Sequence, residues 1–258
     1  MKIFQDKVAV VTGASRGIGR SICVAFASAG AKVVGVARGD LDETAAEVKK
    51  TGSEFIAINA DLGTGKQKDA MDVVAQILQK TGRIDALVNN AGTIRRAPTV
   101  DYSEKDWNEI LQINLSTPFF LCQAVGKWWV KGGREKSPAE SRLKIVNIAS
   151  LLSFQGGILV PAYTASKHGI AGITKALANE WAKERINVNA IAPGYIATEN
   201  TKALREDPVR SKAILERIPE GRWGAPEDIA GGCVFLASTD ADYLNGTIMN
   251  VDGGWLGR

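Results

Sequence analysis

Residues 8–19 read V-A-V-V-T-G-A-S-R-G-I-G and decide the fold of this chain. Val8 to Val11 form a short apolar run typical of a buried strand. The glycine-rich turn Thr12 to Gly19 follows at once, and a helical pattern continues from Arg20 to Ser28, with Gly30 as its stop. Between a strand and a helix, such a turn lets a pyrophosphate approach the backbone beside free N–H groups. The stretch therefore predicts a dinucleotide site.

The same strand-then-helix order recurs along the rest of the chain. Alternation of this kind predicts an α/β fold with a doubly wound parallel sheet, Rossmann-type, with helices on both faces. No linker, repeat or low-complexity segment interrupts the sequence, so residues 1–258 are expected to form a single domain. Further strands are predicted at 32–37, 55–59, 85–88, 145–149, 188–191 and 247–251, and helices at 42–50, 68–80, 104–129, 167–184 and 226–237.

Composition excludes several classes of protein. Of the 258 residues, 45% are apolar and 23% are charged, which is ordinary for a soluble globular chain. The net charge of +4 is spread along the chain without basic blocks, so no nucleic-acid partner is implied. Residues 1–7 lack a signal-peptide design, and no apolar run approaches membrane-spanning length. The three cysteines have no metal-ligand spacing, so we expect buried thiols, no metal and a cytoplasmic protein.

Polar residues stand where predicted parallel strands end. Because ligands of doubly wound sheets bind outside the carboxyl ends of the strands, these residues are expected to line one site. Asp61 is placed to meet an adenine amino group. The set comprises Gly13 to Gly19, Arg38, Asp61, Asn89 to Gly92 and Ser150.

The second strand bears on the choice of cofactor. Dinucleotide folds commonly place an acid at its end for the ribose hydroxyls, but this chain has Ala37 and then Arg38. Arg38, with Arg16 in the glycine-rich turn, is suited to pair with a 2′-phosphate. The residues therefore favour NADP, while Asp40 and Asp42 leave NAD as the alternative.

Residues 150–167, S-L-L-S-F-Q-G-G-I-L-V-P-A-Y-T-A-S-K, carry a candidate acid/base pair. Tyr163 and Lys167 are four residues apart, which puts both side chains on one face of a helix. A nearby ammonium favours the phenolate and is expected to lower the pKa of Tyr163. Ser150 follows the predicted strand 145–149, a usual place for a group that polarises a substrate oxygen.

With these motifs the chain resembles the short-chain dehydrogenase/reductase family over nearly its whole length. The resemblance rests on Thr12 to Gly19, Asn89-Asn90-Ala91-Gly92, Asn114, Ser150, Tyr163-x-x-x-Lys167, Pro193-Gly194 and Asp252-Gly253-Gly254. It implies that Tyr163 is the acid/base and that Lys167 holds the nicotinamide ribose. It also implies that Ser150 binds the reacting oxygen and that Asn114 holds a water of the proton relay. The implied cofactor contacts are Gly13, Ser15, Arg16, Gly17, Ile18, Gly19, Arg38, Asp61, Leu62, Asn89, Ala91, Gly92, Tyr163, Lys167, Pro193, Gly194, Ile196 and Thr198.

Three stretches, 89–96, 194–201 and 217–224, are similar to those of bacterial dehydrogenases of 2-deoxy-D-gluconate or 2-dehydro-3-deoxy-D-gluconate. The resemblance implies an enzyme of sugar-acid (uronate) catabolism that interconverts a hydroxyl and a ketone. Gluconate 5-dehydrogenases and 3-oxoacyl-carrier-protein reductases remain alternatives, as does a regulator without turnover, which would typically lose the Tyr or the Lys. The exact sugar acid and the physiological direction stay open.

A sugar-acid substrate needs a cationic partner for its carboxylate. Arg95 and Arg96 follow the end of the fourth strand, so we predict that at least one of them binds the carboxylate, beside Ser150 and Tyr163.

Residues 196–220 are polar and mixed, and we interpret them as a substrate lid. Residues 131–142 are interpreted as a surface insertion. The resemblance further implies a homotetramer.

Overall fold

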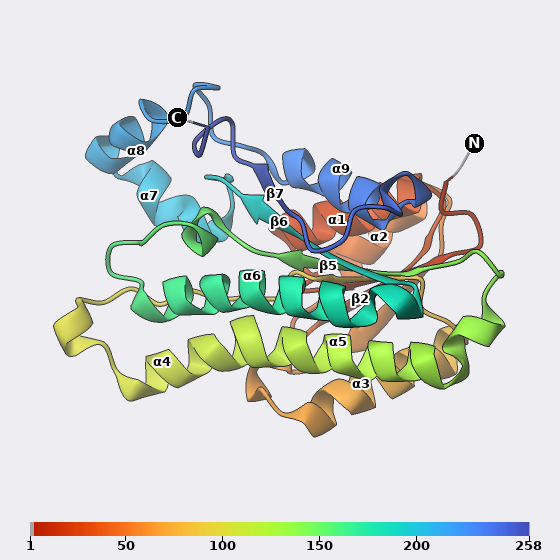
Figure 1. The fold of residues 1–258 in the computed structure, drawn as a ribbon. Coiled ribbons are helices and arrows are strands. Elements are labelled where there is room, and N and C mark those ends of the chain that lie inside the picture. The colour runs from red at the N-terminus through yellow and green to blue at the C-terminus, as the bar shows by residue number, and fades with distance from the viewer. Residues whose placement is uncertain (1–2, 258) are drawn as a thin grey trace.

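Seven parallel strands form one sheet with helices on both faces (Figure 1). The structure, a computed structural model, describes residues 3–257; Met1, Lys2 and Arg258, and with them the ends of the predicted domain, lie outside the described residues. The strands are β1 (Val8–Thr12), β2 (Lys32–Ala37), β3 (Phe55–Asn59), β4 (Ala86–Asn89), β5 (Leu143–Ile148), β6 (Ile186–Pro193) and β7 (Ile248–Val251). The helices are α1 (Gly17–Ser28), α2 (Asp42–Lys50), α3 (Gln67–Thr81), α4 (Glu104–Leu111), α5 (Thr117–Trp128), α6 (Pro161–Trp181), α7 (Lys202–Glu206), α8 (Pro208–Leu215) and α9 (Pro226–Ala237).

The strand order is β3-β2-β1-β4-β5-β6-β7. From β1 the chain first runs outward to β3 and then returns to place β4 on the other side of β1, so Val10 lies between Val34 and Leu87. This reversal between β1 and β4 creates the crevice in which such sheets bind ligands. The predicted α/β fold, one doubly wound parallel sheet in a single domain, is confirmed.

Each face of the sheet carries its own apolar core. Successive residues of a strand point to opposite faces, so Ala9 and Val11 of β1 join the core beneath α1 and α9, while Val8 and Val10 join the core beneath α3, α5 and α6. All three cysteines are free and buried, as predicted. Within residues 3–257, no helix combines the length and apolar character that crossing a bilayer requires.

The prediction of one continuous helix over 104–129 is wrong in one respect, because the α-helix is interrupted in the middle. A π-helical turn, Gln112–Ser116, separates α4 from α5. Pro118 stands in the first turn of α5. Because proline has no N–H, it cannot donate to the carbonyl of Asn114 four residues earlier, and the regular helical ladder is interrupted there. The break lies at the buried Asn114.

The segment predicted as a lid contains regular structure that its polar sequence did not indicate. A 3₁₀ turn, Glu199–Thr201, leads into α7 and α8. Leu204, Ile214 and Ile218 are buried in a small separate apolar cluster that also holds Leu151 and Trp255. These helices stand apart from the main layers in Figure 1. Their inward-facing side chains, and not a regular amphipathic pattern, explain why they form here.

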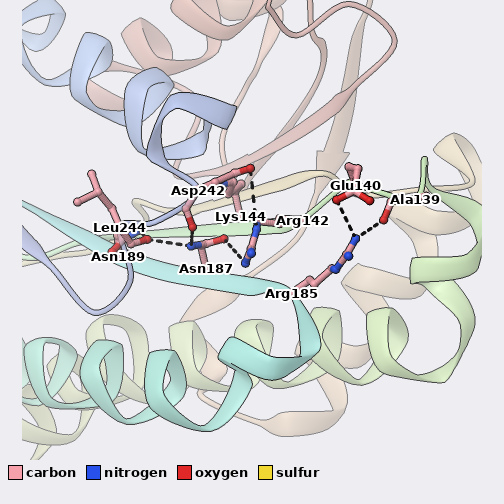
Figure 2. Close-up of polar contacts among 9 residues, drawn as sticks. All are labelled: Ala139, Glu140, Arg142, Lys144, Arg185, Asn187, Asn189, Asp242 and Leu244. Atoms are coloured by element: carbon pink, nitrogen blue, oxygen red, sulfur yellow. Dashed lines mark hydrogen bonds and ion pairs between the residues drawn. The ribbon is translucent and has the colours of Figure 1, made fainter.

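A polar network closes the amino-terminal ends of β5 and β6 (Figure 2). Lys144 is 4% exposed, and its Nζ lies 2.5 Å from Oδ1 of Asp242. The side-chain amide of Asn187 donates to the carbonyl oxygens of Asp242 and Leu244, at 2.9 Å each. The buried ammonium is tolerated because it is paired and hydrogen-bonded. The network holds the chain before β7 to β5 and β6, at the end of the sheet opposite the carboxyl ends of the strands.

Candidate active site

The loops that follow six strands meet at one edge of the sheet, because all strands run in the same direction. The fold thereby brings together groups that are far apart in the sequence. They are the turn after β1 (13–19), Arg38 after β2, Asp61 after β3, the segment 90–96 after β4, Ser150 after β5 and the turn 194–198 after β6.

Two glycines of the glycine-rich turn occupy positions where a side chain would be strained or would collide with the backbone. Gly13 has φ +65°, and a Cβ on Gly19 would lie 2.1 Å from the carbonyl oxygen of Gly13. Helix α1 begins at Gly17, earlier than the predicted Arg20, and Arg16 at its N-cap makes no side-chain capping bond. The first N–H groups of α1 are therefore left for an anionic ligand. A turn this tight, closed by Gly13 and Gly19 at a helix N-terminus, fits the pyrophosphate of a dinucleotide.

Asn90, which directly follows β4, holds the glycine-rich turn in place. Asn90 donates through Nδ2 to the carbonyl oxygens of Thr12 (2.9 Å) and Gly13 (3.2 Å). The side chain of Asn89, a residue predicted to contact the cofactor, lies in the core and donates to Oδ1 of Asn147 at 2.9 Å. Asn89 and Asn90 differ in this way because alternate residues at a strand end face opposite sides, and a contact of Asn89 with the cofactor stays a prediction for its backbone. Only the alternation along β4 could have signalled this.

The residues predicted to contact the adenosine half of the cofactor lie at the same end of the sheet. Arg16 and Arg38 are exposed, and within residues 3–257 neither forms an ion pair. Asp61 accepts a hydrogen bond from the N–H of Gly63 at 2.8 Å, so its own turn orients the carboxylate. Leu62 is buried, and its carbonyl accepts from Thr117. Ser15 is fixed through its carbonyl, which accepts from Arg20.

On the nicotinamide side, the turn after β6 packs against both the C-terminal segment and the glycine-rich turn. A Cβ on Gly194 would lie 2.6 Å from Cα of Asp252. Thr198 approaches Gly17, with Cγ2 at 3.6 Å from where a Cβ would stand. Pro193 and Ile196, two residues predicted to contact the cofactor, are buried.

Tyr163 and Lys167 share one face of α6, as their spacing predicted. Lys167 is 5% exposed; its Nζ donates to the carbonyl of Ile148 at 2.7 Å and lies 5.5 Å from the centroid of the Tyr163 ring. Ser153 donates to the carbonyl of Lys167 at 2.6 Å and ties the helix to the turn after Ser150. Burial lowers the pKa of Lys167 to about 8.

The predicted direction of the Tyr163 pKa is wrong for the protein without ligands. Burial raises the pKa of Tyr163, while hydrogen bonding to Ser150 and the charge of Arg96 lower it by less. The prediction considered only the charge of Lys167 and left out the cost of burying a phenolate. Ser150 itself caps a 3₁₀ turn, accepting from the N–H of Leu152 at 3.2 Å.

Asn114 is held rigidly in the π-helical turn. Its Oδ1 accepts from the N–H of Thr93, and its Nδ2 donates to the carbonyl of Thr93, both at 2.9 Å. Nδ2 also lies 3.3 Å from Oγ of Ser166. The side chain thus has partners on every side, which explains an asparagine inside a helix.

The two candidate carboxylate-binding arginines lie in different surroundings. Arg95 pairs with Glu109, with Nη2 at 2.8 Å from Oε1. Arg96 forms no ion pair within residues 3–257; it donates to the carbonyl of Asn200 at 3.2 Å, at the start of the lid. Burial and the charge of Arg210 lower the pKa of Arg96, while Tyr163 raises it. The charges of Arg96 and Tyr163 thus act on each other, whereas the guanidinium of Arg95 is engaged by Glu109. Arg210 of α8 was not found by sequence reasoning, because only the fold of the lid brings it here.

Taken together, the doubly wound sheet, the glycine-rich turn and the Ser-Tyr-Lys arrangement define an oxidoreductase of the short-chain type. The model of the short chain dehydrogenase family matches residues 7–209, and the chain belongs to that family.

Several relatives resemble the chain over its full length. It is 49% identical over 254 residues to the 2-dehydro-3-deoxy-D-gluconate 5-dehydrogenase of Dickeya dadantii (strain 3937), covering 98% of this chain and 97% of that protein. A structure from Agrobacterium tumefaciens with bound NADP, provisionally named a 2-deoxy-D-gluconate 3-dehydrogenase, is 53% identical with a TM-score of 0.91, covering 100% of this chain and 99% of that chain. A structure from Beutenbergia cavernae with NADP at low occupancy, provisionally named an NAD(P)-dependent gluconate 5-dehydrogenase, is 45% identical with a TM-score of 0.91 and covers 100% of both chains.

Proposed function

We propose that the protein transfers a hydride between a nicotinamide cofactor and a hydroxyl or ketone of a sugar acid, of the 2-dehydro-3-deoxy-D-gluconate or 2-deoxy-D-gluconate type. The observation that carries the chemistry is the buried Lys167 beside Tyr163, next to Ser150 at the end of β5. The substrate class is supported by the names of relatives that are about half identical over the whole chain. Gluconate 5-dehydrogenase is the second candidate, favoured by the Beutenbergia structure.

Tyr163 is the proposed acid/base. In the reducing direction its hydroxyl donates a proton to the carbonyl oxygen of the substrate as that oxygen becomes a hydroxyl; in the oxidising direction the phenolate accepts the proton. The bound nicotinamide supplies or accepts the hydride. Ser150 donates a hydrogen bond to the same substrate oxygen, which stabilises the charge that develops on it.

Lys167 is proposed to act on both cofactor and Tyr163. An ammonium has three N–H donors, and one is directed to the carbonyl of Ile148. The other two are available to ribose hydroxyls and to the phenolate. When the anionic cofactor is bound, the protonated form of Lys167 is favoured, and its charge opposes the rise that burial imposes on the pKa of Tyr163.

Asn114 is proposed to serve the proton relay through its backbone. Its side chain is engaged by Thr93 and Ser166, while Pro118 cannot donate to its carbonyl. That carbonyl is left to hold a water, which passes protons between solvent and Lys167. The break between α4 and α5 would then be a functional feature of the helix.

For the cofactor we propose NADP, with NAD as the alternative. The bound NADP in two similar structures supports this choice. The exposed Arg16 and Arg38 are the proposed partners of the 2′-phosphate, because a guanidinium binds phosphate with two parallel hydrogen bonds. The remaining cofactor contacts are proposed at the residues predicted above, with Asn89 contributing only its backbone.

For the substrate carboxylate we propose Arg96. Arg95 already has a carboxylate partner in Glu109, whereas Arg96 forms no ion pair within residues 3–257 and its charge acts on Tyr163. Arg210 adds a second positive charge from the lid. Two cations at the entrance of the site favour an anionic substrate over a neutral sugar.

We further propose that residues 196–220 are the lid of the site. We also propose that the protein is a homotetramer and acts in the cytoplasm.

The direct test is a substrate panel with the purified protein. NADP and NAD are each offered with 2-dehydro-3-deoxy-D-gluconate, 2-deoxy-D-gluconate and gluconate, and nicotinamide reduction is followed by absorbance; a 3-oxoacyl thioester is offered with the reduced cofactors. We expect the highest kcat/KM with a sugar acid and NADP. Turnover of the acyl thioester alone, or of no sugar acid, contradicts the proposal.

A further inference from the structure

Residues 252–256, which we call the C-terminal hook, follow β7 and pack against the turn 194–198. The two carboxylate oxygens of Asp252 accept from the N–H groups of Gly254 and Leu256, at 2.9 Å each. The carbonyl of Gly253 accepts from the N–H of Glu220, at 3.0 Å, where the lid ends. These bonds hold the hook against the end of the lid, and Trp255 lies within it.

Trp255 packs against the lid on one side. It is 5% exposed and belongs to the apolar cluster that holds Leu204, Ile214 and Ile218. The guanidinium of Arg217 stacks on its ring, with Cζ 4.0 Å from the centroid. The indole is thus in contact with the side chains that hold α7 and α8 in place.

Trp255 also contacts the ring of Tyr195, with centroids 4.8 Å apart, and the turn that carries Ser150. Its Nε1 donates to Oε1 of Gln155 at 3.3 Å, and Leu151 lies in the same cluster. The turn is itself closed: the N–H of Gln155 donates to the carbonyl of Leu151 at 3.2 Å. Trp255 is therefore linked to Ser150 through one hydrogen-bonded turn.

We propose that Trp255 is a positioning residue for the substrate: it fixes the distance between the lid and the Ser150 turn, so that a sugar acid held from the lid side meets Ser150 with its reacting oxygen. This proposal rests on the proposed function. The lid side of the site begins at Asn200, whose carbonyl accepts from Arg96. Arg96 itself follows β4 and is tied to the lid by this hydrogen bond, so a substrate bound at both Arg96 and Ser150 is held between a residue fixed to the lid and the turn that Trp255 joins to the lid.

The test replaces Trp255 by Phe, which keeps an aromatic ring in the cluster and removes the N–H donor to Gln155. Kinetics are measured at saturating NADP. We expect KM for the sugar acid to rise about 2- to 10-fold, as for a lost neutral hydrogen bond, with a smaller change in kcat and unchanged cofactor affinity. Gln155→Leu should cause a similar rise, and the double variant should show no further loss.

The matched control is Trp223→Phe. Trp223 belongs to the same cluster, packing edge-on against Tyr195 with ring centroids 5.6 Å apart, and the substitution leaves the Trp255–Gln155 bond in place. It should leave KM unchanged. If Trp255 is only a packing residue, both variants lower the melting temperature and the active fraction, and KM stays at the wild-type value; that result overturns the proposal.

A second readout does not depend on the substrate. Arg205 and Arg210 are exposed lid residues after which trypsin cleaves. In Trp255→Ala, cleavage at the lid should be at least several-fold faster than in wild type while cofactor binding is retained; if that variant does not fold, Trp255→Phe is digested instead. Equal cleavage rates contradict the role of Trp255. If wild type turns over no sugar acid, the proposed function fails, and the cleavage rates still decide whether Trp255 holds the lid.

Discussion

We expect the stability of the unliganded wild-type protein to rise with pH, and replacing Lys167 by Met should abolish this rise. In the folded protein, burial lowers the pKa of Lys167 from 10.5 to about 8. Below the lower value, Lys167 is protonated in both states, and folding buries a charge. Above it, the folded protein has released a proton that the unfolded chain still binds, so stability increases with pH until the unfolded lysine also titrates.

The two pKa values set the size of the effect. Between about pH 7 and about pH 9.5, the difference in proton binding corresponds to about 2 kcal/mol of additional free energy of unfolding in wild type. Lys167→Met removes the titrating group and with it this increment. It also removes the hydrogen bond to the carbonyl of Ile148, but a neutral amine donates such a bond as an ammonium does, so this loss lowers stability at both pH values.

The assay is denaturant unfolding at the two pH values, without nucleotide. The control is Lys175→Met, which removes an exposed lysine from the same helix and should keep the wild-type dependence on pH. The quantity compared is the pH-induced change in the free energy of unfolding, so stability differences common to both pH values cancel. If this pH-induced change is equal in wild type and Lys167→Met, the assignment of a buried, titrating Lys167 beside Tyr163 is refuted.

Three further predictions concern cofactor and substrate. Arg38→Asp should shift the ratio of kcat/KM for NADPH over NADH by about one to two decades toward NADH, since a charged hydrogen bond contributes roughly 1.5–3 kcal/mol; an unchanged ratio would exclude Arg38 as the 2′-phosphate partner. Arg96→Met should raise KM for a sugar acid far more than for a neutral ketone of similar size, whereas Arg95→Met should change both little; steady-state kinetics showing equal effects would place the carboxylate elsewhere. Gly19→Ala should abolish nucleotide binding in a titration, because its Cβ would stand 2.1 Å from the Gly13 carbonyl oxygen; retained affinity would contradict the role of the glycine-rich turn as the pyrophosphate cradle.

Much of the fold was readable from local sequence. The boundaries predicted for 42–50, 55–59 and 226–237 agree with the structure to the residue. These elements have either a clear amphipathic pattern or a short apolar run bounded by turn residues. The break at Asn114 and the lid helices were missed for different reasons. The first follows from a single absent N–H at Pro118, and the second depends on burial against the C-terminal hook.

The candidate site was predictable where spacing alone determines geometry. Tyr163 and Lys167 are joined by one helical turn, so four residues of sequence suffice. The choice between Arg95 and Arg96 depends instead on where Glu109 of the neighbouring helix lies, which sequence does not indicate. The pKa of Tyr163 depends on burial, and burial is a property of the packed protein.

The central claim, that Tyr163 shuttles the proton, is tested most directly by Tyr163→Phe in the reaction with the preferred sugar acid. The substitution keeps the ring and removes only the hydroxyl. We predict a loss of at least ~100-fold in kcat, in line with general acid–base contributions, with the dissociation constant for NADPH unchanged. Turnover within a few-fold of wild type would contradict the assignment of Tyr163.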